Sequence, residues 1–237
     1  MVFSAGDSIE AEPASWTFRG TSVVNAFDTH VARSVPCYEL GHWLVEQLSD
    51  FFLHDSSLIV DLGCSTGTLL RNLASRHKNP NLRFLGFDTS SDMLSKATNN
   101  TIDSRILYTN EPFLNYCFDS LSFISSYYTM QFIHPKERQL YFDMIYQSLD
   151  WGGAFLLFEK TRAPDARFQD ITTSLYSEYK AKNGYTPGEI YAKSLSLRGV
   201  LNPYTVNANL EFLARAGFSD IMPIFKIISF DGFLCIK

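Results

Sequence analysis

The chain has 237 residues, of which 46% are hydrophobic and 19% charged, and its formal net charge at pH 7 is −5. This length is enough for one large α/β domain with an inserted cap. The acidic balance, without a run of five or six Lys or Arg residues, argues against nucleic acid as a partner. No stretch reaches 18 consecutive apolar residues, so we expect neither a membrane-spanning helix nor a membrane partner.

The N-terminal segment and the cysteines indicate the cellular compartment in which the protein is expected. Residues 1–15 contain acids and lack a basic segment followed by an apolar run, so we do not expect them to form a signal peptide. We expect them to form a flexible tail before a single domain over 16–237. The four cysteines make no C-x-x-C pair and no Cys/His cluster with zinc spacing, so we expect reduced thiols, no metal site and a cytoplasmic protein.

Strand and helix patterns alternate through the first two thirds of the chain. After Pro36, apolar residues recur at helical spacing, at Leu40, Trp43, Leu44 and Leu48. Beyond them, strands are expected over 58–62, 82–87, 104–108, 120–125 and, after a turn, within 151–160, and helices over 68–76, 91–99 and 136–149. Strands that alternate with helices predict a parallel sheet that is wound on both faces.

The alternation ends after residue 160. Residues 161–204 are polar, rich in tyrosine and mostly helical, and we expect them to form a cap over the site. In the cap helix 168–182, Tyr176 lies off an apolar stripe that should face the core, made of Phe168, Ile171, Leu175 and Tyr179. A last helix is expected over 205–217, and a hairpin with a tight turn at Asp231-Gly232 should close the chain.

The stretch IVDLGCSTGTLL (59–70) places a loop of small residues between a buried strand and the helix that follows it. Gly63, Ser65 and Gly67 let the backbone come close to a ligand at this point. Asp88 ends the next strand, 21 residues beyond Gly67, where an acid suits the two hydroxyls of a ribose.

Two cofactor classes compete for this loop. A dinucleotide needs donors for its pyrophosphate and usually the spacing G-x-G-x-x-G, whereas this loop reads G-C-S-T-G and follows Asp61. The Asp61 carboxylate would repel a pyrophosphate but can hold the ammonium group of an amino acid. Asp61, the glycine loop and Asp88 together therefore favour S-adenosylmethionine over another nucleotide.

Several segments carry a resemblance to a known family: RSVPCY (33–38), DLGCSTG (61–67), FDTSSDML (87–94), TMQFI (129–133), the cap segment from NGYTPGEI (183–190) onward and LARAGF (213–218). They resemble the class I S-adenosylmethionine-dependent methyltransferases, and more closely the carboxy-S-adenosyl-L-methionine synthase branch. The resemblance implies a Rossmann-like fold with a seven-stranded, mostly parallel sheet, an antiparallel last strand and a helical cap.

The resemblance also implies cofactor contacts, with Arg33 as partner of the cofactor carboxylate, Tyr38 at its carboxylate or amine, and Asn110 at the adenine amino group. The full predicted set is Arg33, Tyr38, Asp61, Gly63, Ser65, Gly67, Asp88, Thr89, Asn110 and Glu111. Two departures matter. Where the synthases carry an arginine for the extra carboxylate, Lys193 is followed by Ser194, with Arg198 as a candidate substitute. Tyr127 stands where they carry an asparagine.

A sulfonium has three electrophilic carbons, and aromatic faces stabilise its charge. Tyr127, Tyr128 and Tyr176 are therefore candidate catalytic residues, with Asn207 as a candidate substrate contact. Loss of the arginine and gain of tyrosines favour cyclisation of S-adenosylmethionine to azetidine-2-carboxylate with release of methylthioadenosine, as in a related group of cyclases. The alternatives are methyl transfer to a small molecule, carboxy-transfer, which Ser194 disfavours, and binding without catalysis. The exposed aromatic residues expected in the cap suggest a homodimer.

Overall fold

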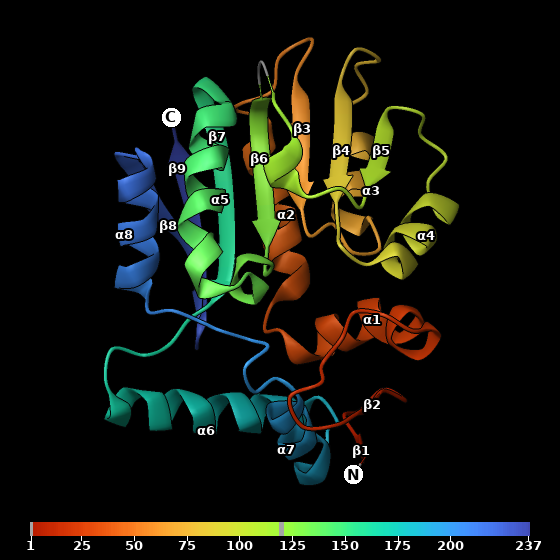
Figure 1. Cartoon of the computed structure of the whole chain (residues 1–237), viewed down its shortest axis with the longest axis vertical. Helices are drawn as coiled ribbons and strands as arrows, with labels where there is room; N and C mark the ends of the chain where they lie inside the picture. The colour runs from red at the N-terminus through yellow and green to blue at the C-terminus, as the bar shows by residue number, and fades with distance from the viewer. Residues whose placement is uncertain (1, 119–120) are drawn as a thin grey trace.

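The computed structural model describes residues 2–118 and 121–237, and its centre is a seven-stranded sheet of order β5-β4-β3-β6-β7-β9-β8 (Figure 1). The strands are β3 (Leu58–Leu62), β4 (Arg83–Phe87), β5 (Ile106–Thr109), β6 (Leu121–Tyr127), β7 (Leu149–Lys160), β8 (Asp220–Ile227) and β9 (Phe230–Ile236). The last strand, β9, runs antiparallel to both its neighbours, and the other pairs are parallel. The predicted Rossmann-like methyltransferase fold is confirmed.

The central strands are apolar on both sides because helices cover both faces of the sheet. Every residue of β6 is buried. Successive residues of β3 point to opposite faces, so that Ile59 joins one core cluster and Val60 the other. A parallel sheet that is covered on both faces favours such continuous apolar strands over an alternating pattern.

Two pairs of helices cover the faces of the sheet. Helices α2 (Tyr38–Ser49) and α3 (Thr68–Arg76) supply Val45, Leu70 and Leu73 to the first core cluster. Helices α5 (Pro135–Ser148) and α8 (Val206–Ala216) lie on the opposite face in Figure 1 and supply Phe142 and Leu213 to the second. Helix α4 (Ser91–Asn99) packs near β5.

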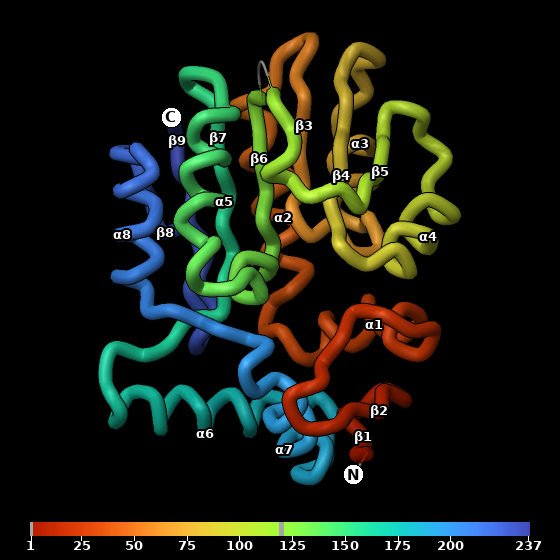
Figure 2. The backbone as a smooth tube through the Cα atoms, viewed as in Figure 1, coloured from red at the N-terminus to blue at the C-terminus, as the bar shows by residue number. Residues whose placement is uncertain are grey.

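The parallel strands all end at one edge of the sheet, and further helices lie beyond this edge. They are α1 (Thr21–Ser34), α6 (Ala166–Lys182) and α7 (Pro187–Ser196), seen below the sheet in Figure 2. Helices α6 and α7 fall inside the predicted cap, 161–204. None of the helices in the described part of the chain is both long and apolar enough to cross a bilayer.

The N-terminal segment, expected to be a flexible tail, is packed onto the cap. It forms a short hairpin of β1 (Phe3–Ser4) and β2 (Glu10–Ala11) against α7. Ala5 and Ile9 are each 1% exposed and share a core cluster with Trp16. The expectation failed because these apolar residues are too few and too irregular to form a periodic pattern, although tertiary contacts bury them.

Two further expectations need correction. In α6, Phe168, Ile171 and Leu175 are 44%, 50% and 47% exposed, so this stripe does not face the core. The closing turn lies at residues 228–229, and Asp231 and Gly232 belong to β9, paired with Lys226 and Phe225. A side chain at Gly232 would collide with Phe158 and Phe225, so this glycine serves close packing rather than a turn.

Candidate functional site

The loop between β3 and α3 has the left-handed backbone that its small residues predicted. The φ angles are +75° at Gly63, +52° at Ser65 and +75° at Gly67. A Cβ atom on Gly63 would lie 2.1 Å from the Thr129 hydroxyl oxygen, and one on Gly67 would lie 2.2 Å from the Tyr108 hydroxyl oxygen. The glycines thus let the loop pack closely against the neighbouring strand ends, where a side chain would collide.

Asp88, directly after β4, braces this loop. Its Oδ2 accepts a hydrogen bond of 2.9 Å from the amide of Ser65, and its Oδ1 accepts one of 2.8 Å from the amide of Ser90. Burial raises the pKa of Asp88, and the two amides oppose that effect. Thr89, the next residue, is exposed. A ribose contact by Asp88 or Thr89 stays a prediction.

Asp61, in β3 just before the loop, is deeply buried, with 3% of its surface exposed. It accepts a hydrogen bond of 2.7 Å from the Ser125 hydroxyl of β6. Burial is the main cause that raises its pKa to about 7; the Ser125 hydrogen bond opposes this rise and the charge of Asp88 contributes to it. A cationic ligand group nearby would favour the ionised carboxylate, which is the role predicted for Asp61.

Two predicted cofactor contacts, of which Asn110 was expected at the adenine, follow β5 at the same edge of the sheet. Thr109 pairs with Phe87 at the end of β4, and its carbonyl accepts a bond of 3.2 Å from the amide of Asp88. Asn110 and Glu111 come next, and both are exposed. The structure therefore brings these two predicted residues beside Asp88.

Tyr38 and Tyr127 form one aromatic group with His42. The Tyr127 hydroxyl donates a bond of 2.6 Å to the backbone carbonyl of Tyr38, and the two rings lie 5.1 Å apart. Gly41 makes room for this hydroxyl, because a Cβ there would lie 2.0 Å from it. Tyr127 therefore anchors α2 to the sheet, and a catalytic role for it stays a prediction.

Tyr128 differs from its neighbour. Its backbone is left-handed, with φ of +59°, although it is not glycine. Its ring lies 5.6 Å from Phe230, and its buried hydroxyl finds no partner among the described residues. Burial raises its pKa, so the phenol is neutral near pH 7. A strained residue with an unsatisfied hydroxyl at the end of a strand is typical of a functional position.

Tyr176 reaches from the cap helix α6 back toward the sheet. Its hydroxyl donates a bond of 3.0 Å to the carbonyl of Ser34, and its ring lies 5.2 Å from Phe230. The ammonium groups of Lys160 and Lys180 lie 4.4 Å and 4.3 Å from its ring centre. Sequence reasoning treated Lys160 only as a strand-end residue and did not single out Lys180, because nothing local shows that β7 and α6 meet here.

Four other residues from the sequence analysis lie elsewhere. Arg33 pairs with Asp7 and donates to the carbonyl of Asn183, so its guanidinium joins the N-terminal segment to the cap. Asn207 is exposed in the first turn of α8, whose N-cap is Thr205. Ser194 and Arg198, at and near the position of the missing arginine, are both exposed. In the described part of the chain, no group of three His, Cys, Asp or Glu side chains could hold a metal ion.

The fold and the loop define a class of protein, and comparisons with known proteins agree with it. Residues 59–153 match the model of a methyltransferase domain family. Human N-acetylserotonin methyltransferase, solved with S-adenosylmethionine, aligns with a TM-score of 0.60 and 19% identity over 91% of this chain and 55% of its own. Phosphoethanolamine N-methyltransferase 2 of Haemonchus contortus aligns with a TM-score of 0.63 and 16% identity over 93% and 58%. The chain thus has the fold of a methyltransferase domain.

Relatives with similar sequences identify the family to which the chain belongs. The carboxy-S-adenosyl-L-methionine synthase of Staphylococcus epidermidis is 36% identical over 225 residues, which cover 95% of this chain and 98% of the relative. The synthase of Campylobacter lari is 36% identical over 234 residues, or 98% of this chain and 99% of the relative. The chain belongs to the carboxy-S-adenosyl-L-methionine synthase family.

Proposed function

We propose that the protein uses S-adenosylmethionine as a substrate and places a carboxyl group on its sulfonium methyl carbon, which forms carboxy-S-adenosylmethionine. The observation that carries this proposal is a pair of lysines, the half-buried Lys160 and the buried Lys180, whose ammonium groups lie over the ring of Tyr176. They supply positive charge beside the loop edge of the sheet, although the arginine expected from the relatives is replaced by Ser194. Full-length similarity to named synthases supports the same reaction.

In this proposal the loop residues hold the substrate. Asp88 and Thr89 would contact the ribose, Asn110 and Glu111 the adenine, and Asp61 the ammonium group. The amides of Gly63 and Cys64 already donate to the Phe87 carbonyl, at 2.7 Å and 2.9 Å, so they brace the loop rather than bind the ligand. The amides of Ser65 and Gly67 are engaged as well, by Asp88 Oδ2 at 2.9 Å and by the Cys64 carbonyl at 2.8 Å, so the small residues of the loop would let the ligand approach closely rather than donate to it.

The reaction needs one bond to break and one to form at the sulfonium methyl. A methyl C–H bond breaks and its proton leaves, and the C–C bond that joins the donor acid to its carboxyl group also breaks. The carboxyl carbon forms a new C–C bond to the methyl carbon, while the electron pair of the broken bond stays on the donor, which takes up a proton in place of the one lost from the methyl group. The donor acid is an anion and must bind next to the sulfonium. The sulfonium supplies only one positive charge, so further cationic side chains would help to hold the donor. Lys160 and Lys180 would hold the donor and its product carboxylate by charge-assisted hydrogen bonds.

Cyclisation to azetidine-2-carboxylate is the second candidate, and the replacement of the arginine by Ser194 favours it. In that reaction the neutral amine attacks its own γ-carbon, the C–S bond breaks, and its electron pair stays on sulfur in methylthioadenosine. Neutral phenols such as Tyr128 and Tyr176 would stabilise the sulfonium. Clustered lysines argue against this reaction, because positive charge repels a cationic substrate that has no anionic partner.

The experiment separates the reactions by their products. The protein is produced in a bacterial strain without its own carboxy-S-adenosylmethionine synthase, and extracted nucleosides are identified by mass spectrometry. Carboxy-S-adenosylmethionine with the wild type, and none with D88A, is the expected result. Purified protein is also given S-adenosylmethionine alone, with boiled protein as control. Azetidine-2-carboxylate formed with an equal amount of methylthioadenosine would replace the proposal by cyclisation, and S-adenosylhomocysteine formed with a methylated compound would replace it by methyl transfer.

A further inference from the structure

A short turn after β6 carries the strained tyrosine of the site. Tyr128 directly follows β6 in a left-handed backbone conformation, and the short 3-10 helix η2 (Met130–Phe132) begins two residues later. Between them, Thr129 packs against the glycine loop, because a Cβ atom on Gly63 would lie 2.1 Å from its hydroxyl oxygen. The turn therefore lies directly against the predicted cofactor loop.

The side chain of Gln131, in η2, holds Tyr128 in this conformation. Its Nε2 donates a hydrogen bond of 3.0 Å to the carbonyl of Tyr128, and its Oε1 accepts one of 2.8 Å from the amide of Lys160. The amide of Tyr128 donates a bond of 2.9 Å to the carbonyl of Phe158. Both backbone groups of Tyr128 thus have partners, which stabilise a conformation that a residue with a side chain rarely adopts.

The backbone of Gln131 makes two further hydrogen bonds. Its amide donates a bond of 3.0 Å to Oε1 of Glu159, and its carbonyl accepts one of 2.9 Å from the amide of Asn202. Glu159 is 0% exposed and Gln131 is 6% exposed. Loss of a partner at such a buried site is costly, so these bonds fix the place of Gln131 firmly.

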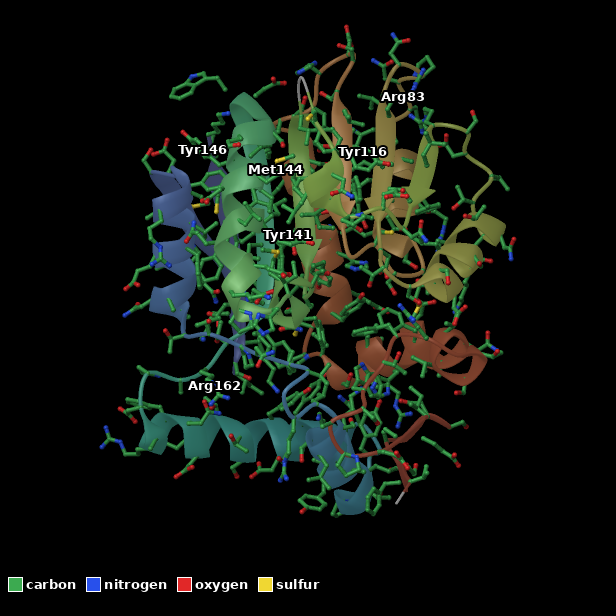
Figure 3. All side chains as sticks on the ribbon, in the orientation of Figure 1. Arg83, Tyr116, Tyr141, Met144, Tyr146 and Arg162 are labelled. Atoms are coloured by element: carbon green, nitrogen blue, oxygen red, sulfur yellow. The ribbon has the colours of Figure 1, made fainter. Side chains whose placement is uncertain are left out.

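Two of these partners belong to the connections between the sheet and the cap. Lys160 ends β7, where the chain enters the cap, and Asn202 lies where the chain returns from α7 to α8. The two connections are neighbours, because the amide of Arg162 donates a bond of 2.8 Å to the carbonyl of Tyr204. Figure 3 shows Arg162 between the sheet and α6. Gln131 is therefore bonded to the chain both where it enters the cap and where it leaves it.

We infer that Gln131 is a positioning residue, which holds the ring of Tyr128 at the site and links its position to that of the cap. The inference rests on the proposed function for the identity of the substrate, S-adenosylmethionine. The ring of Tyr128 lies 6.5 Å from that of Tyr38 and 5.6 Å from that of Phe230. An aromatic face stabilises a cation only where the ring faces it, so a changed backbone at Tyr128 would remove this contribution without removing the ring.

Two ligands that differ in charge test this role. Sinefungin carries an ammonium group where S-adenosylmethionine has its sulfonium, whereas S-adenosylhomocysteine has a neutral thioether. Calorimetry gives both dissociation constants, and their ratio measures the preference for the cation. Q131M removes both side-chain hydrogen bonds and should lower this preference about threefold or more, with S-adenosylhomocysteine affinity changed less than about twofold. Y128L should lower the preference by a similar factor, and Q147M, at an exposed position of α5, should change neither constant.

The double variant Q131M/Y128L separates positioning from a general structural role. It should lose no more of the preference than Y128L alone, because Gln131 acts through the ring of Tyr128. Binding of S-adenosylhomocysteine shows that each variant is folded. If Q131M does not fold, Q131E gives the same test, since its carboxylate can accept from the Lys160 amide but cannot donate to the Tyr128 carbonyl.

Three results would overturn the inference: an equal loss of affinity for both ligands, an unchanged preference in a folded Gln131 variant, or losses that multiply in the double variant. If folded wild type bound neither ligand, the proposed function would fail together with the inference. The assay needs no turnover. A protein that gives the expected ratios but forms a product other than carboxy-S-adenosylmethionine would therefore refute the proposed function alone.

Discussion

Lys180 is a buried cation in the cap, and its burial disfavours the charged form of its side chain. Its ammonium group is buried against an aromatic ring, and burial together with the charge of Lys160 lowers its pKa to about 7. The unfolded chain restores the ordinary value near 10.5. Between these two values the unfolded state binds more protons than the folded state, so this group makes the free energy of unfolding rise with pH.

K180M therefore should stabilise the ligand-free protein, by about 1–3 kcal/mol at pH 7, because it removes a buried charge that lacks a partner. The advantage over wild type should be largest at and below pH 7 and should shrink as the pH rises toward 10. Urea unfolding at several pH values measures it. A K180M protein that is less stable than wild type at pH 7, with K182M on the exposed face of α6 unchanged, would show that the ammonium group is satisfied within the chain.

Asp61 gives a second prediction at the residue scale. Its pKa of about 7 in the free protein means that acid conditions protonate it, and a bound ammonium group needs the carboxylate. Affinity for S-adenosylhomocysteine should therefore fall as the pH decreases from 8 to 6. In D61N this dependence should largely disappear, and affinity at pH 8 should drop about tenfold or more. A D61N protein that keeps the wild-type pH profile would assign the titration to another group.

At the scale of elements, the pattern of the sequence was a good guide to the sheet. The structure has β3 at 58–62, α3 at 68–76 and α4 at 91–99, as expected, because each is set by local periodicity and capping. The strand expected to begin at Ser120 starts at Leu121 in the described residues. Where the local sequence pattern predicted the wrong structure, contacts between residues far apart in the sequence determine the conformation. Asp231-Gly232 reads as a turn locally, and only the contact with Phe158 explains its place in a strand.

The join between α2 and β6 can be tested with Gly41. Alanine usually stabilises a helix relative to glycine by about 1 kcal/mol. Here the new Cβ would lie 2.0 Å from the Tyr127 hydroxyl, so G41A should destabilise the protein by about 1–3 kcal/mol. Y127F removes that hydroxyl, and the double variant should recover part of the loss.

G188A is the matched control for this experiment, because Gly188 lies in α7 and its Cβ would meet nothing closer than 4.0 Å. It should be neutral or stabilising in the same urea unfolding series. If the destabilisation of the G41A/Y127F double variant equals the sum of the two single effects, Gly41 and the Tyr127 hydroxyl do not lie in contact.

At the scale of the whole molecule, the N-terminal segment joins α1 to the cap. Asp7 accepts hydrogen bonds from His30, Arg33 and Tyr185, which come from α1 and from the turn between α6 and α7. The sequence could not show this cluster, because its members are separated by up to 178 positions. The same reason hid the lysine pair, whereas the loop of Gly63 and Gly67 was visible because its residues are consecutive.

D7A should therefore destabilise the packing of the cap without destabilising the sheet. The substitution removes the acceptor that lies 2.8 Å from His30 Nδ1 and leaves the Tyr185 hydroxyl only its contacts of 3.1 Å and 3.4 Å to His30, at a cost of about 1–3 kcal/mol. Hydrogen exchange should become faster in α6 and α7 and stay unchanged in β3 and β6. D170A, at an exposed position of α6, is the control. Uniformly faster exchange throughout the chain would show that the segment supports the whole fold rather than the cap.

The fate of the methyl carbon of S-adenosylmethionine tests the central claim most directly. The expressing strain, without its own synthase, is fed methionine labelled with ¹³C at the methyl group, and the nucleosides are analysed by mass spectrometry and NMR. We predict that the label stays between the sulfonium and a new carboxyl group in carboxy-S-adenosylmethionine. Label found only in methylthioadenosine, beside unlabelled azetidine-2-carboxylate, or moved to another molecule with S-adenosylhomocysteine left behind, would contradict the account.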